Sequence, residues 1–272
     1  HVRSRRQRQM CIRDSPTAEG VRPAVIQATK SAQIFVLDRE TGQPLVPVTE
    51  VPVPQTDVPG ERSSATQPMS LDMPNTMGRP GKTHEVLTEA STWGLTPFDQ
   101  IMCRIDFRKA HYEGLWTPAR VDQNSLVYPG HHGGLNWGGV MVDPKHGLLL
   151  VNNQRLPYMQ SLVSREKLDA LGAKSFQEAP GQSKGFRVQQ GQAYGATKGP
   201  WMSVLDQPCI APPWGYISGI DLRTREVIWS RPFGTGYDNG PMGIPSRTQW
   251  EIGTPSDLSL IHISEPTRLR RI

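Results

Sequence analysis

The sequence has few cysteines, few aromatic residues and no long apolar run. Of its 272 residues, three are cysteine and 7% are aromatic. No stretch reaches the roughly 18 consecutive apolar residues that a membrane-spanning helix needs, so we expect no membrane span within the printed residues. The cysteines show no CxxC spacing, so they give no sign of a zinc site.

The formal net charge of +5 is confined to the two ends of the chain. Residues 1–15 contribute +4 and residues 257–272 contribute +1, which leaves 16–256 neutral. A nucleic-acid-binding domain carries its basic residues on one face, so we expect no nucleic-acid partner. Both ends resemble translated sequencing adapters, with a natural basic arm and tail as the alternative. We therefore predict that 1–15 and 257–272 are non-native tails around one domain, 16–256.

Cys11 falls in the first of these ends, which leaves Cys103 and Cys209 within the domain. A disulfide between them suits an exported protein. Two buried free thiols are the alternative, and the spacing does not decide between the two.

Glycine (26 residues) and proline (25 residues) are abundant, which favours short strands joined by turns. Three segments are typical of hairpins, and they are 34–46, 140–151 and 216–229. We expect a short helix over 164–171, and long loops over 48–95 and the rest of 164–213. The adjacent pair His131 and His132 would point to opposite faces of an extended chain, which favours a solvated loop pair over metal ligands.

The first and third hairpins share a pattern in which Asp38 or Asp221 ends a strand and Thr41 or Thr224 follows three positions later. Short polar side chains there can bond the backbone of the turn. The separation between the two patterns would hold about four units of 40–50 residues, the size of a propeller blade. These features together predict an all-β fold.

Eight ordered motifs resemble the membrane-bound PQQ-dependent dehydrogenases of the glucose/quinate/shikimate family. They cover most of 20–256 and are ATKSAQIFVLDRETGQPLVP (28–47), TPFDQ (96–100), YEGLWTP (112–118), YPG (128–130), NWGG (136–139), VDP (142–144), PWGYIS (213–218) and IDLRTREVIW (220–229). The resemblance implies a partial eight-bladed β-propeller with about half of its blades present.

The same resemblance implies an activity and its cofactors. The expected reaction is oxidation of a sugar, a quinate- or shikimate-type cyclic polyol or another polyol. The expected cofactors are PQQ and a divalent metal ion, calcium or magnesium, and the expected electron acceptor is membrane ubiquinone. The parent protein would act at the periplasmic face of the bacterial inner membrane.

Two residues gain a cofactor-binding role through the resemblance. Lys30 stands where the family has a lysine that bonds the quinone oxygens of PQQ, and an ammonium there would stabilise developing negative charge. Asn152 stands where the family has an asparagine that contacts PQQ near the ion, and an amide suits either partner. An exposed lysine at a strand start and a turn asparagine are the ordinary interpretations.

The resemblance does not supply a complete active site. The family's general base, an aspartate shortly before the lysine, has no counterpart here, and neither has the indole that stacks on PQQ or the N-terminal membrane anchor. We therefore assign no catalytic residue and no metal ligand, and we expect a fragment that is inactive alone. A non-catalytic propeller used as a binding scaffold is the alternative, and Lys30 and Asn152 argue against it.

Overall fold

The computed structural model describes residues 10–17, 20–136, 140–238 and 240–254. Most of the regular structure is antiparallel strand. The strands are β1 (Met10–Thr17), β2 (Gly20–Ala28), β3 (Ile34–Asp38), β4 (Val48–Pro52), β5 (Thr66–Ser70), β6 (Ser125–Val127), β7 (Val140–Asp143), β8 (Leu148–Gln154), β9 (Tyr158–Ser164), β10 (Tyr194–Pro200), β11 (Gly215–Asp221) and β12 (Glu226–Pro232). The helices are α1 (Pro97–Lys109) and α2 (Arg165–Ala170), with single 3₁₀ turns at Glu89–Ser91 and Pro241–Gly243.

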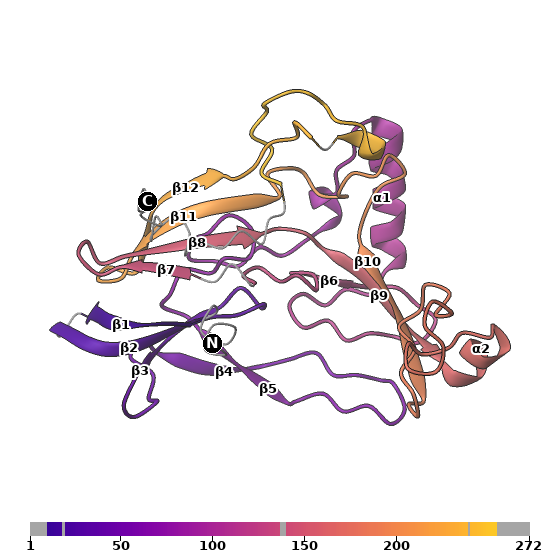
Figure 1. Ribbon diagram of the computed structural model, residues 1–272, viewed down its shortest axis with the longest axis horizontal. Helices are drawn as coiled ribbons and strands as arrows, with labels where there is room; N and C mark the ends of the chain where they lie inside the picture. The colour runs from indigo at the N-terminus through magenta and orange to yellow at the C-terminus, as the bar shows by residue number, and fades with distance from the viewer. Residues whose placement is uncertain (1–9, 18–19, 137–139, 239, 255–272) are drawn as a thin grey trace, which may run out of the picture.

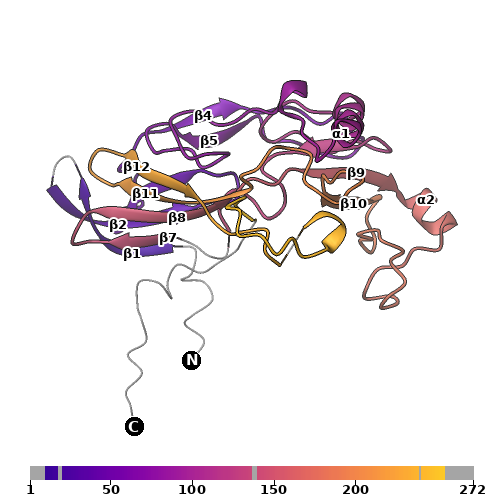
Figure 2. The ribbon, with the colours of Figure 1, turned by 90° about the horizontal axis from the view of Figure 1, so that it is seen from above.

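Two sheets stack against each other at one end of the molecule (Figures 1 and 2). One has the strand order β1-β2-β3 and the other the order β12-β11-β8-β7. Alternate side chains of each strand point into the space between them, where Ile26 and Ile34 of the first sheet share a core with Leu149, Val151 and Ile220 of the second. Removal of these side chains from water is what holds the two sheets together.

The other end of the molecule holds the sheet β10-β9-β6 and helix α1, and the hairpin β4-β5 lies between the two ends (Figure 1). A second core lies here, and it includes Leu126, Tyr128, Trp201 and Trp214. Helix α2 lies at the far end of β9 in Figure 1. Strand β8 of the second stacked sheet is followed after a short segment by β9, so the chain passes from one end to the other between residues 154 and 158.

The hairpin expectations are largely confirmed. β7 and β8 pair as predicted, and so do β11 and β12. The Asp38 and Asp221 carboxylates each accept hydrogen bonds from two backbone N–H groups of their turns. The partner of β3 within 34–46 is a single bridge between Leu37 and Pro44, and the main neighbour of β3 is β2.

Helix α1 was not predicted, and it corrects the all-β expectation for 97–109. Thr96 caps it by accepting from the Asp99 N–H, and Pro97 occupies its first turn. Asp99 in the first turn and Lys109 in the last suit the helix dipole. By contrast, the predicted short helix over 164–171 is present as α2, with Ser164 as its cap. The structure also forms β4, β5 and β10 in segments expected to be loops.

The N-terminal segment contributes a strand. β1 pairs with β2 over its whole length, from Met10 opposite Gln27 to Thr17 opposite Gly20. Residues 10–15 are therefore part of a sheet, whereas the sequence predicts that they lie outside the domain. The non-native origin of 1–15 stays a prediction, and 257–272 lie outside the described residues. Within the described residues, no helix is both long and apolar enough to cross a membrane.

Candidate functional site

Lys30 lies at the tip of the turn between β2 and β3. The turn is closed by backbone hydrogen bonds between Thr29 and Gln33 and between Ala32 and Thr29. The Lys30 side chain is exposed, and its Nζ donates to the carbonyl oxygen of His131 at 3.0 Å. An ammonium has three N–H groups. Among the described residues only this one partner is found, so two N–H groups face solvent or a ligand.

The loop that follows β6 passes directly over this turn. The Gly134 N–H donates to the Lys30 carbonyl at 2.9 Å, and the Gln154 N–H donates to the Gly134 carbonyl at 2.8 Å. Gly133 has φ +80°, and a Cβ there would come within 2.6 Å of the Lys30 Cα. Glycine is therefore required for the close approach. This chain of hydrogen bonds ties the turn of Lys30 to the end of β8.

Asn152 lies inside β8, two residues before Gln154. The strand continues to Gln154, so Asn152 is a strand residue rather than a turn residue, and it is 6% exposed. Its neighbour Asn153 points to the opposite face of the sheet. There the Asn153 Nδ2 donates to the carbonyls of Thr76 and Gly78 at 2.8 and 2.9 Å. Asn153 is thus committed to holding the 76–78 segment, and Asn152 is the asparagine on the other face.

Arg155, directly after β8, is the centre of a partly buried ion-pair network that sequence reasoning missed. Its Nε donates to the Glu85 carboxylate at 2.7 Å, and its Nη1 donates to the Ala211 carbonyl at 2.5 Å. Nη2 and the Tyr128 hydroxyl also bond Glu85. Glu85 is 70 residues from Arg155 in the sequence, so no local pattern reveals the pair. The network fixes the end of β8 against two distant segments.

The network also shifts the pKa values of its members. Burial alone would raise the pKa of Glu85, but the hydrogen bonds and charge of Arg155 outweigh burial and lower it. Burial raises the pKa of Tyr128, and the nearby Glu85 charge adds to the rise. Glu85 is therefore an anion and Tyr128 a neutral donor at neutral pH, which matches the hydrogen bonds described.

His131 and His132 both lie against the ring of Tyr158, the first residue of β9. The His131 ring meets it edge-on at 5.2 Å between centroids, and the His132 ring stacks on it at 5.8 Å. His132 is exposed as expected for a solvated loop, whereas His131 is half-buried. Burial lowers the pKa of His131, with further contributions from Lys198, Lys30 and His132, so the imidazole is neutral at neutral pH.

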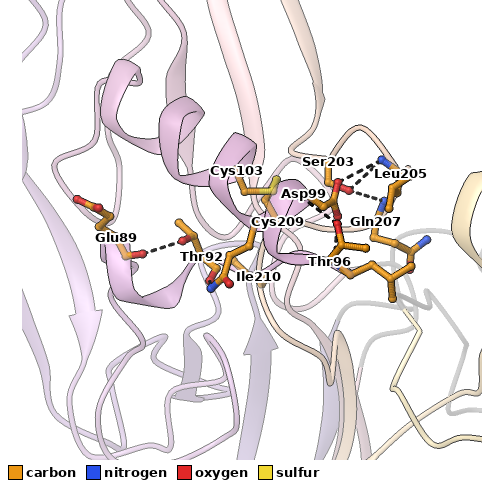
Figure 3. The surroundings of a disulfide bond; sticks show 12 residues. Glu89, Thr92, Thr96, Asp99, Cys103, Ser203, Leu205, Gln207, Cys209 and Ile210 are labelled. Atoms are coloured by element: carbon orange, nitrogen blue, oxygen red, sulfur yellow. Dashed lines mark hydrogen bonds between the residues drawn. A yellow bond between two sulfur atoms is a disulfide. The ribbon is translucent and has the colours of Figure 1, made fainter.

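Cys103 of α1 and Cys209 form a disulfide bond (Figure 3). The structure thus selects the disulfide from the two alternatives that the spacing left open. The bond joins the helix to the segment before β11, where the Trp93 N–H also donates to the Cys209 carbonyl at 2.8 Å. Both sulfurs are buried in the second core. Disulfides persist in oxidising compartments.

No group of three His, Cys, Asp or Glu side chains that could hold a metal ion occurs within the described ranges.

Comparison with known proteins shows which protein family the chain resembles. A family model described as the β-propeller domain of PQQ glucose/ethanol/alcohol dehydrogenases matches residues 7–265. The glycerol dehydrogenase large subunit of Gluconobacter thailandicus is 40% identical over 258 residues, which are 92% of this chain and 34% of that protein. The quinate/shikimate dehydrogenase (quinone) of Acinetobacter baylyi is 41% identical over 244 residues, which are 89% of this chain and 29% of that protein.

The quinoprotein glucose dehydrogenase of Escherichia coli is 38% identical over 233 residues, which are 86% of this chain and 28% of that protein. The chain thus spans about a third of the length of the relatives that it matches. The family model covers far more than half of the chain. The chain belongs to the PQQ-dependent dehydrogenases of the glucose/quinate family, in the part described as their β-propeller domain.

Proposed function

We propose that this chain is the PQQ-binding part of a dehydrogenase that oxidises a CH–OH group of a sugar, a quinate- or shikimate-type cyclic polyol or another polyol. In this proposal residues 16–256 form about half of an eight-bladed propeller. The support comes from family membership together with one structural observation. That observation is the junction at Gly134, which ties the turn of Lys30 to the end of β8 that carries Asn152.

PQQ suits the residues at this junction. It is a quinone with carboxylate groups, so its outer atoms are mostly hydrogen-bond acceptors. Lys30 offers two N–H donors and a positive charge on an exposed side chain. The glycines at 133 and 134 leave no side chain over the Lys30 turn. When bound, PQQ supplies the redox chemistry, and the protein orients and polarises it.

The roles of the two residues follow from their chemistry. Lys30 Nζ would donate to a quinone or carboxylate oxygen, and its charge would stabilise negative charge that develops there. The Asn152 amide can donate through Nδ2 or accept through Oδ1. Asn152 would therefore orient the cofactor from the face of β8 opposite Asn153. The Arg155–Glu85 pair would keep the end of β8 in place.

A divalent ion, calcium or magnesium, is part of the proposal for the whole enzyme. Such ions take oxygen ligands, and the Asn152 Oδ1 is an oxygen of the right kind. The described residues supply no cluster of acidic side chains to complete the shell.

The electron acceptor and location of the parent protein complete the proposal. We propose membrane ubiquinone as the acceptor and the periplasmic face of the inner membrane as the location, with attachment through an N-terminal anchor outside this chain. The Cys103–Cys209 disulfide supports an oxidising compartment. The name of one relative, a quinate/shikimate dehydrogenase (quinone), supports a quinone acceptor.

Binding of PQQ to the 272-residue chain tests the proposal. The chain is titrated with PQQ, and quenching of tryptophan fluorescence is followed. Loss of a hydrogen bond to a charged group costs about 1.5–3 kcal/mol, so Lys30→Ala should weaken binding by roughly tenfold or more.

Lys82→Ala is the matched control, because the Lys82 side chain is 90% exposed and its one ion-pair partner among the described residues is Glu226, at 4.0 Å. It should leave the PQQ affinity unchanged. An equal affinity of Lys30→Ala and the wild type for PQQ would contradict the assignment of Lys30.

A further inference from the structure

Four basic side chains gather around the ring of Tyr158. His131 and His132 contact the ring directly, and Lys30 Nζ bonds the His131 carbonyl at 3.0 Å. Lys198 comes from β10, where it pairs with Gln160 of β9. Because side chains two residues apart share a face of a sheet, Lys198 lies on the same face as Tyr158. We call Lys30, His131, His132 and Lys198 the basic cluster.

Within the described part of the chain, the charges of the two lysines of the cluster are not balanced by acidic side chains. Neither Lys30 nor Lys198 forms a salt bridge with any described residue. The titratable groups facing His131 are Lys30 from the β2–β3 turn, His132 from its own loop, and Lys198 and Tyr158 from β10 and β9. Burial lowers the pKa of His131 most, and Lys198, Lys30 and His132 each lower it further. The cluster therefore has a positive potential on a partly exposed surface.

His131 has one feature that a solvated loop residue lacks. Its Nε2 is buried and has no hydrogen-bond partner among the described residues. A buried polar atom without a partner is uncommon in native proteins and costs free energy. A carboxylate against this ring would supply an acceptor for Nε2–H and the negative charge that favours a protonated imidazole. The same group would receive hydrogen bonds from the two exposed lysines.

We infer that Lys198, His131 and His132 extend the Lys30 site into a carboxylate-binding cluster. The inference rests on the proposed function, since it adds residues to the site that Lys30 defines. Two sources of carboxylate share this chemistry, a hydroxy-acid substrate and the carboxylates of PQQ. A neutral polyol offers no charge to the cluster and gains nothing from it, so the cluster would favour hydroxy acids over uncharged substrates or would hold PQQ itself.

An NMR pH titration of the imidazole groups in the 272-residue chain tests the inference without any turnover. The probes are PQQ, quinate as a hydroxy acid, and glycerol as the neutral polyol. Proton binding and carboxylate binding at one site favour each other, and the coupling is reciprocal. Either carboxylate should therefore raise the pKa of His131, and glycerol should leave it unchanged.

Lys198→Gln separates an electrostatic role from a structural one. Without ligand, it should raise the pKa of His131, because it removes a positive neighbour. With ligand, it should weaken carboxylate binding by about tenfold, as expected for loss of a charge-assisted contact. Lys145→Gln is the control, because Lys145 is an exposed residue of the β7–β8 turn. It should change neither measurement.

The outcomes identify the source and separate the two proposals. If quinate shifts His131 in the PQQ-saturated chain, the substrate is the source; if PQQ shifts it and quinate adds nothing, the cofactor is the source. No shift with either carboxylate, or an equal shift with glycerol, overturns the inference. If Lys30→Ala lowers the affinity for PQQ, but Lys198→Gln changes the binding of neither carboxylate, the inference alone is overturned. If a carboxylate shifts the pKa of His131, but Lys30→Ala binds PQQ as tightly as the wild type does, the proposed function alone is overturned.

Discussion

Removing the disulfide between Cys103 and Cys209 should destabilise the folded chain substantially. The two cysteines are 106 residues apart in the sequence, so the bond closes a long loop in the unfolded chain. The chain-entropy relation gives about 4.8 kcal/mol at 25 °C for a loop of this length. Measured effects of native disulfides are commonly about 2–5 kcal/mol. We therefore expect Cys103→Ala/Cys209→Ala to lower the free energy of unfolding by about 2–5 kcal/mol.

Urea unfolding followed by far-ultraviolet circular dichroism measures this difference. The comparison uses the oxidised wild type, the reduced wild type and the double variant, and the two proteins without the bond should have similar midpoints. Alanine is chosen because both sites are buried, at 1% and 0% exposed, and a serine hydroxyl there would lack a partner.

Counting thiols in the unfolded oxidised chain checks the bond itself. The sequence has three cysteines, and two are in the disulfide, so only the thiol of Cys11 should react. Three reactive thiols, or a midpoint unchanged by reduction, would refute the reasoning.

Three further predictions concern the sheets and the ion-pair network. Glu85→Gln should cost about 2 kcal/mol, because it leaves the partly buried Arg155 guanidinium beside a neutral amide. The folded pKa of Glu85 lies below its usual 4.5, so wild-type stability should fall as pH drops below that value. Thermal melts across acid pH should show that the melting temperature falls less steeply with decreasing pH in Glu85→Gln than in the wild type. The same dependence on pH in both proteins would count against the network. Leu149→Ala should cost about 2–5 kcal/mol in urea unfolding, since Leu149 is 0% exposed between the two stacked sheets; a loss below 1 kcal/mol would show that these sheets are not packed as described. Asp38→Ala should loosen the turn after β3, because two backbone N–H groups lose their acceptor. Hydrogen exchange should become faster in β3 than in the wild type and stay unchanged in β11, and an unchanged rate in β3 would contradict this.

The sequence predicts those parts of the fold whose signal is local. The turn after Asp221 is one example, because the carboxylate and the N–H groups that it binds are two and three residues apart. The short helix after Ser164 is another, since its cap bonds the Lys167 N–H. Both are found where the sequence predicts them.

Elements that depend on distant partners could not be predicted in this way. β10 contains glycines and a proline and is typical of a loop, yet it pairs along its whole length with β9, about 35 residues earlier. Helix α1 exposes Phe98 and Ile101 and buries Asp99, which hides the usual apolar pattern. Its cap at Thr96 and its first-turn proline were the available signals.

The candidate site likewise combines residues that the sequence predicts with contacts between distant residues that it does not predict. Lys30 and Asn152 were chosen through the family resemblance, and the structure joins the backbone of Lys30 through Gly134 to Gln154, two residues after Asn152 in β8. The contact between Lys30 Nζ and the His131 carbonyl spans 101 residues, and the pairing of Arg155 with Glu85 spans 70. Such contacts arise only once the sheets are packed, so neither spacing nor composition reveals them.

Lysine footprinting with PQQ tests the central claim most directly, because it reports on single side chains. The chain is treated with a limiting amount of an amine-acetylating reagent, with and without saturating PQQ, and each lysine is quantified by mass spectrometry. The account predicts that PQQ lowers the labelling of Lys30, which lies exposed at the β2–β3 turn. Lys82 and Lys145, which are exposed elsewhere, should be labelled equally in both samples. If Lys30 is labelled at the same rate with saturating PQQ, the claim that Lys30 binds the cofactor is wrong.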